Sequence, residues 1–332
     1  MTSTNEVDVA SDDGETVCSD EVAVCYLCLD GGLDYADQPL RRDCACRGTD
    51  AGFVHLSCLK DYAKAKSIQA HNSMNELVTP WQVCPSCNHY YQNELGIDVA
   101  TKFMSFVRRQ YPGDTQRQVE SLYVKLLALN SMINRLQPVQ KREAGVTADV
   151  LLSMIDRMKV DVSPLPRRYS HMEAHAYNVP GRIALDEGTE DSARRAVVHF
   201  ENDLKVREAI GDDEGAANAK NNIASAKYMY ESGINEEELL KISQELYKLR
   251  VAQLGEKNEL TIEAGKFHAI NLQVADRGGE ARELLTKLLA TSKQVLGHHH
   301  STTKDVEMAL EQVVDNEDSD SSDNNDENDD DK

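Results

Sequence analysis

Seven cysteines and one histidine in the first third of the chain form four closely spaced pairs of metal-binding side chains. The pairs are Cys25 with Cys28, Cys44 with Cys46, His55 with Cys58, and Cys84 with Cys87. Two ligands separated by one or two residues can bind the same ion, because the chain between them forms only a tight turn. Eight soft ligands arranged in pairs therefore predict two tetrahedral zinc sites.

Disulfide bonds are the other common use of paired cysteines, and they require an oxidising compartment. Residues 1–24 are acidic and polar, with no basic start and no apolar run of signal-peptide length. We therefore expect reduced thiols that are free to bind metal. Loop-forming residues beside the pairs, such as Gly31, Gly48 and Pro85, disfavour cysteines that are simply buried in a core.

The order of the ligands is four cysteines, a histidine and three cysteines, with eight residues between Cys46 and His55. This pattern resembles the RING-CH (RING-variant) family of zinc fingers. A PHD finger has the same ligand order, but it usually has a wider second pair, a shorter gap before the histidine and a tryptophan two residues before the seventh ligand. Here Trp81 lies three residues before Cys84.

The resemblance implies a small, zinc-stabilised, cross-braced α+β finger. In such a finger one ion is bound by Cys25, Cys28, His55 and Cys58, and the other by Cys44, Cys46, Cys84 and Cys87. Spacing alone leaves three pairings of the four ligand pairs open. A module of this size can hardly bury a core of its own. We therefore expect metal binding to supply most of its folding free energy, on the order of 10 kcal/mol per site.

RING-type fingers act as ubiquitin ligases without covalent chemistry, because they hold a ubiquitin-charged conjugating enzyme in a reactive geometry. The resemblance therefore implies no catalytic residue and an apolar partner surface made of Leu27, Tyr62 and Pro85. Each of these residues could equally pack the finger's core or shape a metal knuckle. Many active RING ligases have a basic residue after the last ligand, where this chain has Asn88, which can donate a hydrogen bond but brings no charge.

The formal net charge of −21 is concentrated at the two ends of the chain. Residues 1–24 hold seven acidic side chains and no Lys or Arg, and residues 311–332 hold eleven acidic side chains and one lysine. These compositions predict disordered acidic tails at 1–22 and 311–332. Cys18 lies in the first tail, outside the zinc pattern, and no adjacent histidine or cation would activate its thiol.

Between the tails we expect a finger at 23–95, a helical spacer or degenerate repeat at 96–166, and helical repeats at 167–310. No run of about 18 apolar residues occurs, so we expect no membrane span. Apolar residues from Val119 to Leu136 recur every three or four positions and predict a helix that ends at Pro138; a second helix is predicted at 147–159. The mildly basic charge of residues 98–170 suits contact with the acidic tails better than nucleic-acid binding.

The last part of the chain shows internal similarity. Segments that end in glycine recur at gaps of 44 and 42 residues, at 208–211, 252–255 and 294–297. A second set of positions recurs along the same segment. Small residues lie at Gly181, Ala226 and Ala269, and a turn former follows each of them seven positions later, at Gly188, Gly233 and Asp276. Five positions further on lie Ala193, Glu238 and Ala281, where Glu238 is the one residue that is not small. Helical hairpins at this spacing stack into an all-α solenoid.

The loops after two of these glycines match each other, as Gly255-x-x-Asn258-x-x-Thr261 and Gly297-x-x-His300-x-x-Thr303. They resemble tetratricopeptide (TPR) repeats of the kinesin-light-chain type, over about three repeats from 168 to 310. The histidine triplet 298–300 is interpreted as part of a loop and not as a metal tract, because only the last histidine recurs in register.

Solenoids expose a concave surface that commonly binds peptides or helices of partner proteins. We expect Asn221, Asn222, Lys227 and Tyr228 to face it. Two functions fit the chain. The first is a ubiquitin ligase in which the finger positions the conjugating enzyme and the repeats recruit a protein or peptide substrate; the second is a non-enzymatic zinc-finger scaffold or PHD-like peptide reader. Both predict a soluble cytoplasmic or nuclear protein with two Zn2+ and no nucleic-acid or membrane partner.

Overall fold

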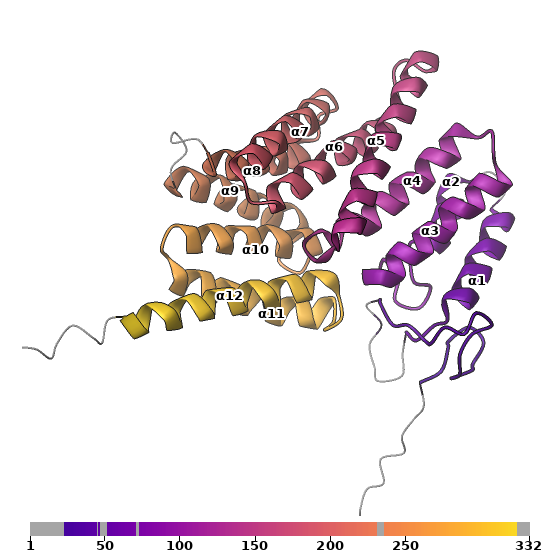
Figure 1. The fold of residues 1–332 in the computed structure, drawn as a ribbon, viewed down its shortest axis with the longest axis horizontal. Helices are drawn as coiled ribbons and strands as arrows, with labels where there is room; N and C mark the ends of the chain where they lie inside the picture. Colours follow the sequence, from indigo (N-terminus) through magenta and orange to yellow (C-terminus); the bar gives the residue numbers. More distant parts are fainter. Residues whose placement is uncertain (1–22, 45, 47–51, 71–72, 231–235, 324–332) are drawn as a thin grey trace, which may run out of the picture.

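The computed structural model describes residues 23–323, except for 45, 47–51, 71–72 and 231–235; beyond residue 313 it describes only the backbone. Almost all of this part is helical (Figure 1). The helices of the first half are α1 Leu56–Gln69, α2 Met74–Val78, α3 Asn93–Gln110, α4 Thr115–Asn130 and α5 Pro138–Asp161, with 3-10 turns η1 Thr79–Trp81 and η2 Ile133–Arg135. The helices of the second half are α6 Arg167–Asp186, α7 Glu190–Ala209, α8 Asp213–Tyr228, α9 Glu236–Leu254, α10 Glu259–Val274, α11 Gly278–Val295 and α12 Ser301–Asp323.

The β component of the expected α+β finger is smaller than predicted. Within the described residues it consists of two isolated antiparallel bridges, Arg41 with Val54 and Val83 with Tyr90. The second bridge belongs to a short hairpin. On one side the Tyr91 N–H donates to the Gln82 carbonyl at 2.8 Å; on the other the chain turns back at once, with the Cys84 N–H donating to the His89 carbonyl and the Asn88 N–H to the Cys84 carbonyl, both at 2.9 Å. Turns at the ligand pairs replace the strands.

The N-terminal region buries more apolar surface than we expected, because it shares a core with α3. Leu59 of α1, Trp81 of η1 and Phe103 of α3 are almost completely buried in one cluster. The Trp81 ring stacks on Phe103 and Phe106 with centroid distances of 5.3 and 5.4 Å, and its indole N–H donates to Ser67 Oγ at 2.7 Å. Metal binding is therefore not the only source of stability in this region.

A second core joins α3, α4, α5 and α6. The predicted apolar face from Val119 to Leu136 is buried in it, which confirms that interpretation of the sequence. The helix limits differ, because α4 ends at Asn130 and Pro138 begins α5 instead of ending α4. Proline suits the first turn of a helix, where its missing N–H would have no partner in any case.

Helices α6 to α12 confirm the predicted stack of helical hairpins. Each helix packs against the next, and Figure 1 shows these helices grouped on the side of the molecule away from α1 to α3. The close approaches lie where the small residues recur. A Cβ on Gly181 of α6 would lie 2.6 Å from the Phe200 ring of α7, and Ala226 and Ala269 occupy the corresponding buried positions on α8 and α10.

The repeated turns are also confirmed where they are described. Gly211, Gly255 and Gly297 end α7, α9 and α11 with φ values of +64°, +82° and +91°, a left-handed conformation that favours glycine. The turns inside the hairpins use Gly188 and Asp276 at φ of 70° and 56°. Gly233, the third member of that register, lies outside the described residues.

The predicted acidic tail from residue 311 begins inside a helix. Helix α12 continues to Asp323 and packs on α10 and α11, with Val306 and Val313 buried against them. These two valines explain why the helix extends past residue 310. Residues 1–22, with Cys18, and residues 324–332 lie outside the described residues. No helix in the part of the chain that the structure describes is long and apolar enough to cross a membrane.

Candidate metal centres

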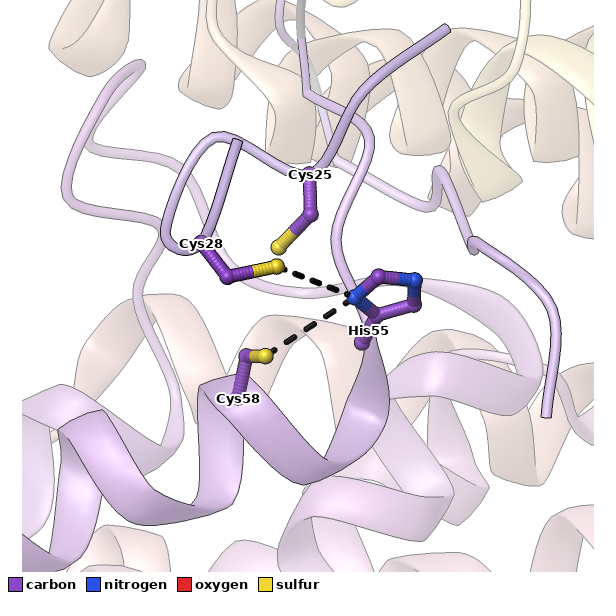
Figure 2. A group of neighbouring side chains, drawn as sticks. All are labelled: Cys25, Cys28, His55 and Cys58. Atoms are coloured by element: carbon purple, nitrogen blue, oxygen red, sulfur yellow. Dashed lines mark hydrogen bonds between the residues drawn. The ribbon is translucent and has the colours of Figure 1, made fainter. Parts of the chain in front are cut away.

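The first candidate metal centre brings together Cys25, Cys28, His55 and Cys58 (Figure 2). Their ligand atoms all lie within 4.8 Å of one another. His55 is the N-cap residue of α1 and Cys58 lies in its first turn, so helical geometry places these two side chains on one face. Cys25 and Cys28 come from the turn of chain that faces this end of α1, and the Leu27 N–H points at Cys25 Sγ from 3.4 Å.

The histidine of this centre presents a lone pair to the cysteines. Its Nε2 atom lies 2.8 Å from the Gly32 carbonyl oxygen, which can only accept a hydrogen bond, so Nε2 carries the proton. In the neutral ring, which is the form that binds metal, Nδ1 is then the nitrogen without a proton, and it lies 3.4 Å from Cys28 Sγ and 3.8 Å from Cys58 Sγ. A metal-binding histidine typically has this arrangement, with its second nitrogen bound to a carbonyl.

The second candidate centre contains Cys44, Cys46, Cys84 and Cys87, again with all ligand atoms within 4.8 Å of one another. Cys46 Sγ and Cys84 Sγ are 3.7 Å apart. The grouping of the two centres is interleaved, as the resemblance to RING-CH fingers implies. Cys25 and Cys28 lie with His55 and Cys58, and Cys44 and Cys46 lie with Cys84 and Cys87.

The donor sets suit zinc. Burial raises the pKa of the Cys46 and Cys58 thiols to about 12, because several sulfur atoms share a small space with little water. Burial also acts on Cys25, but backbone N–H groups of His55, Cys28 and Leu27 outweigh it and lower the pKa of this thiol to about 7. A divalent cation would stabilise the thiolates together, and closed sets of three or four cysteines are typical of structural Zn2+. Bound there, zinc would supply cross-links and no reaction.

Sequence analysis missed two residues that shape these centres. Asp34 accepts hydrogen bonds from the backbone of Ser57, Ala36 and Gln38; its interactions with Ser57 contribute most to lowering its pKa to about 2, and they tie the loop after Cys28 to the start of α1. Gly52 has φ of +84° and touches the second centre. The sequence signal for Gly52 was its position shortly after the second ligand pair, but glycine is common in any loop.

Gly52→Ala is expected to weaken zinc binding at the second centre selectively. An added Cβ would lie 2.8 Å from Cys46 Cβ and 3.1 Å from Cys44 Sγ, and the left-handed backbone alone costs about 1–2 kcal/mol for a residue with a side chain. We expect at least about tenfold lower affinity in a chelator competition assay. Gly32→Ala is the control, because its Cβ would make only an ordinary 3.4 Å contact with Asp30. Equal losses in both variants would contradict the assignment.

The four residues expected to form a partner surface lie in two environments. Leu27 and Tyr62 are half-buried and pack against the first core, whereas Pro85 and Asn88 are exposed on the second ligand knuckle. Asn88 has φ of 58°, a conformation that asparagine tolerates better than most residues. Asparagine therefore suits this position for a local reason of backbone conformation.

A cavity of about 500 Å³ lies between α3–α4 and the inner helices of the repeats, which are α6, α8 and α10. Asn222 lines it, as expected from the sequence, but Asn221, Lys227 and Tyr228 do not. Asn221 is buried and the Tyr228 hydroxyl donates to Glu236. The concave side of the repeats thus faces the chain's own α4, which the sequence did not predict.

Several of the charges around this cavity form ion pairs. Arg207 binds Asp212 at 2.7 Å, Arg250 binds Glu214 at 3.2 Å, and Lys266 lies 3.5 Å from Asp305. Arg182 donates to the Asn130 side-chain oxygen at 2.8 Å. Among the described residues no carboxylate lies within 4.0 Å of Arg182, and no cation lies within 4.0 Å of Glu263. Arg182 and Glu263 therefore lack an ion-pair partner at this distance, but each acts electrostatically on the other, and burial raises the pKa of Glu263.

The end of the finger contacts the last repeat directly. Ser301 Oγ donates to Gln92 Oε1 at 2.6 Å, and Asn93 Nδ2 donates to the His299 carbonyl at 3.1 Å. Arg135 of η2, after α4, lies 3.3 Å from Asp305 beside these contacts. His300 is buried, and burial lowers its pKa to about 4. Neither candidate metal group of the described residues includes the triplet 298–300, so these histidines belong to a packed loop.

No family model matches the chain, and no curated protein matches its sequence. The crystal structure of BtubC (BKLC) from P. vanneervenii aligns at 16% identity with a TM-score of 0.42, covering 72% of this chain and 94% of that one. A structure of kinesin light chain TPR-like repeats from Podosopora anserina aligns at 11% identity with a TM-score of 0.37, covering 72% and 95%.

Proposed function

We propose that this protein is a two-zinc, RING-CH-type ubiquitin ligase. Its finger would hold a ubiquitin-charged conjugating enzyme, and its helical repeats would recruit a protein substrate. The observation that carries the proposal is the interleaved grouping of eight ligands into two sets, three cysteines with one histidine and four cysteines. Zinc here would fix the shape of a docking surface, so the contribution to the reaction would be positioning alone.

The finger offers a surface for such a partner. Leu27 lies in the turn between Cys25 and Cys28, and Pro85 lies in the turn between Cys84 and Cys87, so each metal centre would hold one apolar contact residue in place. Tyr62 is on α1, the helix that also carries Cys58. Binding through a few rigid, partly exposed apolar side chains is typical of protein interfaces.

The repeats would be of the kinesin-light-chain TPR type and would bind a segment of the substrate. The cavity between α4 and the repeats supports this role, since its volume lies in the range of ligand pockets. Arg182 and Glu263 would each gain a counter-charge from a segment with one acidic and one basic side chain. Unpaired charges in a partly enclosed site are costly, so a charged ligand would offset that cost.

The alternative is a zinc-finger scaffold without ligase activity, and Asn88 favours it because the residue brings no charge to the last ligand knuckle. A PHD-like peptide reader receives less support. Tyr26 and Trp81 are the aromatic residues that lie near the finger in sequence, but the Trp81 ring is buried, stacked on Phe103 and Phe106 and hydrogen-bonded to Ser67. It cannot line an open aromatic cage without unfolding the first core.

The test is a ubiquitination assay of the zinc-loaded full chain with activating enzyme and a panel of conjugating enzymes. We expect ubiquitin chains, an about tenfold lower rate for Leu27→Ala, and a higher rate for Asn88→Arg. Leu33→Ala is the matched control, since Leu33 is 61% exposed in the same loop but lies outside the expected partner surface. Zinc content is measured in every variant. Full zinc with no chains, even for Asn88→Arg, would overturn the ligase and leave the scaffold.

A further inference from the structure

The side chain of Asn93, the first residue of α3, connects three separate parts of the chain. Its Nδ2 atom donates to Asp43 Oδ1 at 2.9 Å and to the His299 carbonyl at 3.1 Å, and its Oδ1 accepts from Arg135 Nη1 at 3.1 Å. Only 6% of the residue is exposed. Both N–H donors of the amide and its oxygen are therefore used, and they join the finger, the turn before α12 and η2.

These hydrogen bonds do not serve helix α3 itself. Gln92 is the N-cap residue of α3, but its side chain does not cap the helix; its Oε1 instead accepts from Ser301 Oγ at 2.6 Å. Asn93 has φ of 53°, a left-handed conformation that asparagine tolerates better than most residues. Both residues at the start of α3 thus direct their side chains to the last repeat, and Asn93 also binds the finger.

On the finger side this contact reaches the second metal centre. Asp43 directly precedes the ligand Cys44, and the start of α3 binds it twice. The Gln92 N–H donates to the Asp43 carbonyl at 2.7 Å, and Asn93 donates to the Asp43 carboxylate. Cys44 is buried with the other three ligands of its centre around it. Contacts that hold Asp43 in place therefore also hold Cys44 in place.

On the repeat side the contact reaches the cavity. His299 lies in the turn before α12, and Ser301 is the first residue of that helix. Arg135 lies 3.3 Å from Asp305 of α12, and Asp305 lies 3.5 Å from Lys266 of α10. Asp305 and Lys266 both line the cavity. A continuous series of covalent bonds, hydrogen bonds and ion pairs thus connects the second metal centre to the cavity wall.

We propose that zinc binding at the second centre and the docking of the last repeat on the finger stabilise each other. The donor set of this centre suits structural zinc, and zinc bound there would hold Asp43 where Asn93 can bind it. The docked repeat would in turn hold Asn93 and Asp43 in the positions that favour zinc binding. Such coupling is reciprocal, because two binding events that share one set of contacts change each other's free energy by the same amount. Zinc at this centre would therefore regulate how firmly the repeats are held against the finger.

The first metal centre provides an internal comparison. Its supporting hydrogen bonds stay within the finger: His55 Nε2 donates to the Gly32 carbonyl at 2.8 Å, and the Ser57 N–H donates to Asp34. We therefore expect the two centres to respond differently to a change in the last repeat. The inference concerns metal binding and stands whether or not the finger has ligase activity.

The zinc affinity of the full chain, measured by chelator competition, tests the finger side of the contact. Asn93→Gly removes the amide and keeps a residue that adopts positive φ, so we expect about tenfold weaker binding at the second centre and an unchanged first centre. Asn88→Gly is the matched control, because Asn88 also has positive φ, at 58°, but is exposed and lies beside the ligand Cys87. We expect it to change neither affinity by more than about twofold. Cadmium-113 NMR of the cadmium-loaded chain assigns the two centres, since sets of four and of three sulfur ligands give separate signals.

A change within the last repeat separates the coupling from a local effect on the finger. Ser301→Ala removes the hydrogen bond to Gln92, and we expect about threefold weaker zinc binding at the second centre alone. Ser292→Ala is the matched control, because Ser292 is also a buried serine of this repeat, but its hydroxyl donates to the Leu289 carbonyl of its own helix at 3.0 Å. We expect this variant to bind zinc as the wild type does.

Amide hydrogen exchange measures the coupling in the opposite direction. The His300 N–H donates to the Gly297 carbonyl in the turn before α12. We expect this amide to exchange several times faster in Cys44→Ser and at the wild-type rate in Cys28→Ser. Unchanged zinc affinity in Ser301→Ala, an equal loss at both centres in Asn93→Gly, or equal exchange of His300 in the two cysteine variants would each overturn the coupling. A chain that binds no zinc at all would overturn the metal centres themselves, and the coupling with them.

Discussion

Cys44→Ser is expected to reduce the zinc content from two ions to one for each chain and to unfold the loops around the second centre. Cys44 is buried among Cys46, Cys84 and Cys87, and serine is a poor zinc ligand in such a site. A structural zinc site contributes on the order of 10 kcal/mol to folding, more than the whole stability of many domains. This is the largest effect that we expect from a single substitution.

Amide hydrogen exchange measures which residues lose structure in the Cys44→Ser variant. Protection should fall in residues 38–46 and 82–92, which hold the second centre. It should persist in α1 and α3, because Leu59, Trp81 and Phe103 share a core that needs no metal, and in α6 to α12. Cys18→Ser is the control, since this cysteine lies outside the ligand pattern. Unchanged zinc content in Cys44→Ser would contradict the assignment of the second centre.

Arg207→Leu is expected to destabilise the first two repeats by about 3–5 kcal/mol. Asp203 is completely buried, and its carboxylate is bound by the Arg207 Nε at 2.5 Å and by Asn178 Nδ2 at 2.9 Å. Arg207 also binds Asp212, the N-cap residue of α8, at 2.7 Å, so one side chain connects α7 to the start of the next hairpin. Its removal leaves a buried carboxylate without a cation.

Urea unfolding at two pH values measures this effect. Burial already raises the pKa of Asp203, and loss of Arg207 should raise it further. A carboxyl group whose pKa is higher in the folded than in the unfolded chain favours folding as pH falls, so the loss should be smaller at mildly acidic than at neutral pH. Arg195→Leu breaks only an exposed pair with Glu187 and should cost less than about 1 kcal/mol. Equal losses in the two variants would show that the buried pair is not important.

The metal ligands could be predicted because zinc restricts residue type and spacing so strongly. Cys25 with Cys28 or Cys84 with Cys87 are recognisable in sequence alone. Their grouping into two sets depends on contacts across up to 43 residues (Cys44 to Cys87), and only the resemblance to a family supplied it. Gly52 could not be identified, because its φ of +84° and its contact with Cys46 are properties of the folded loop.

The helical repeats were predictable for a similar reason. Close packing requires small residues at Gly181, Ala226 and Ala269, and the turns between repeats require glycine, so both recur with the period of the hairpins. The end of α4 was predicted wrongly, because apolar residues continue in register through a 3-10 turn up to Leu136. Periodicity shows which residues are buried, but it does not show whether the backbone hydrogen bonds continue.

The burial of charged residues inside the repeats could not be predicted from sequence periodicity. Asp203 and Arg207 lie four residues apart on α7 and look like an ordinary pair on a solvated helix face. Only the packing of α7 between α6 and α8 shows that they are buried. The cavity beside Arg182 and Glu263 was missed for the same reason, because it forms only where α4 packs against the concave side of the repeats.

Native mass spectrometry of the full chain, purified without chelator, tests the central claim most directly. Eight ligands in two sets predict a mass that corresponds to two zinc ions for each chain, with one ion lost in Cys44→Ser and one lost in Cys28→Ser. Acid should release both ions and leave eight free thiols, since the chain has eight cysteines and we expect no disulfide. A metal-free chain lighter by two hydrogens for each pair of cysteines would show that the pairs form disulfides instead, and would contradict the account.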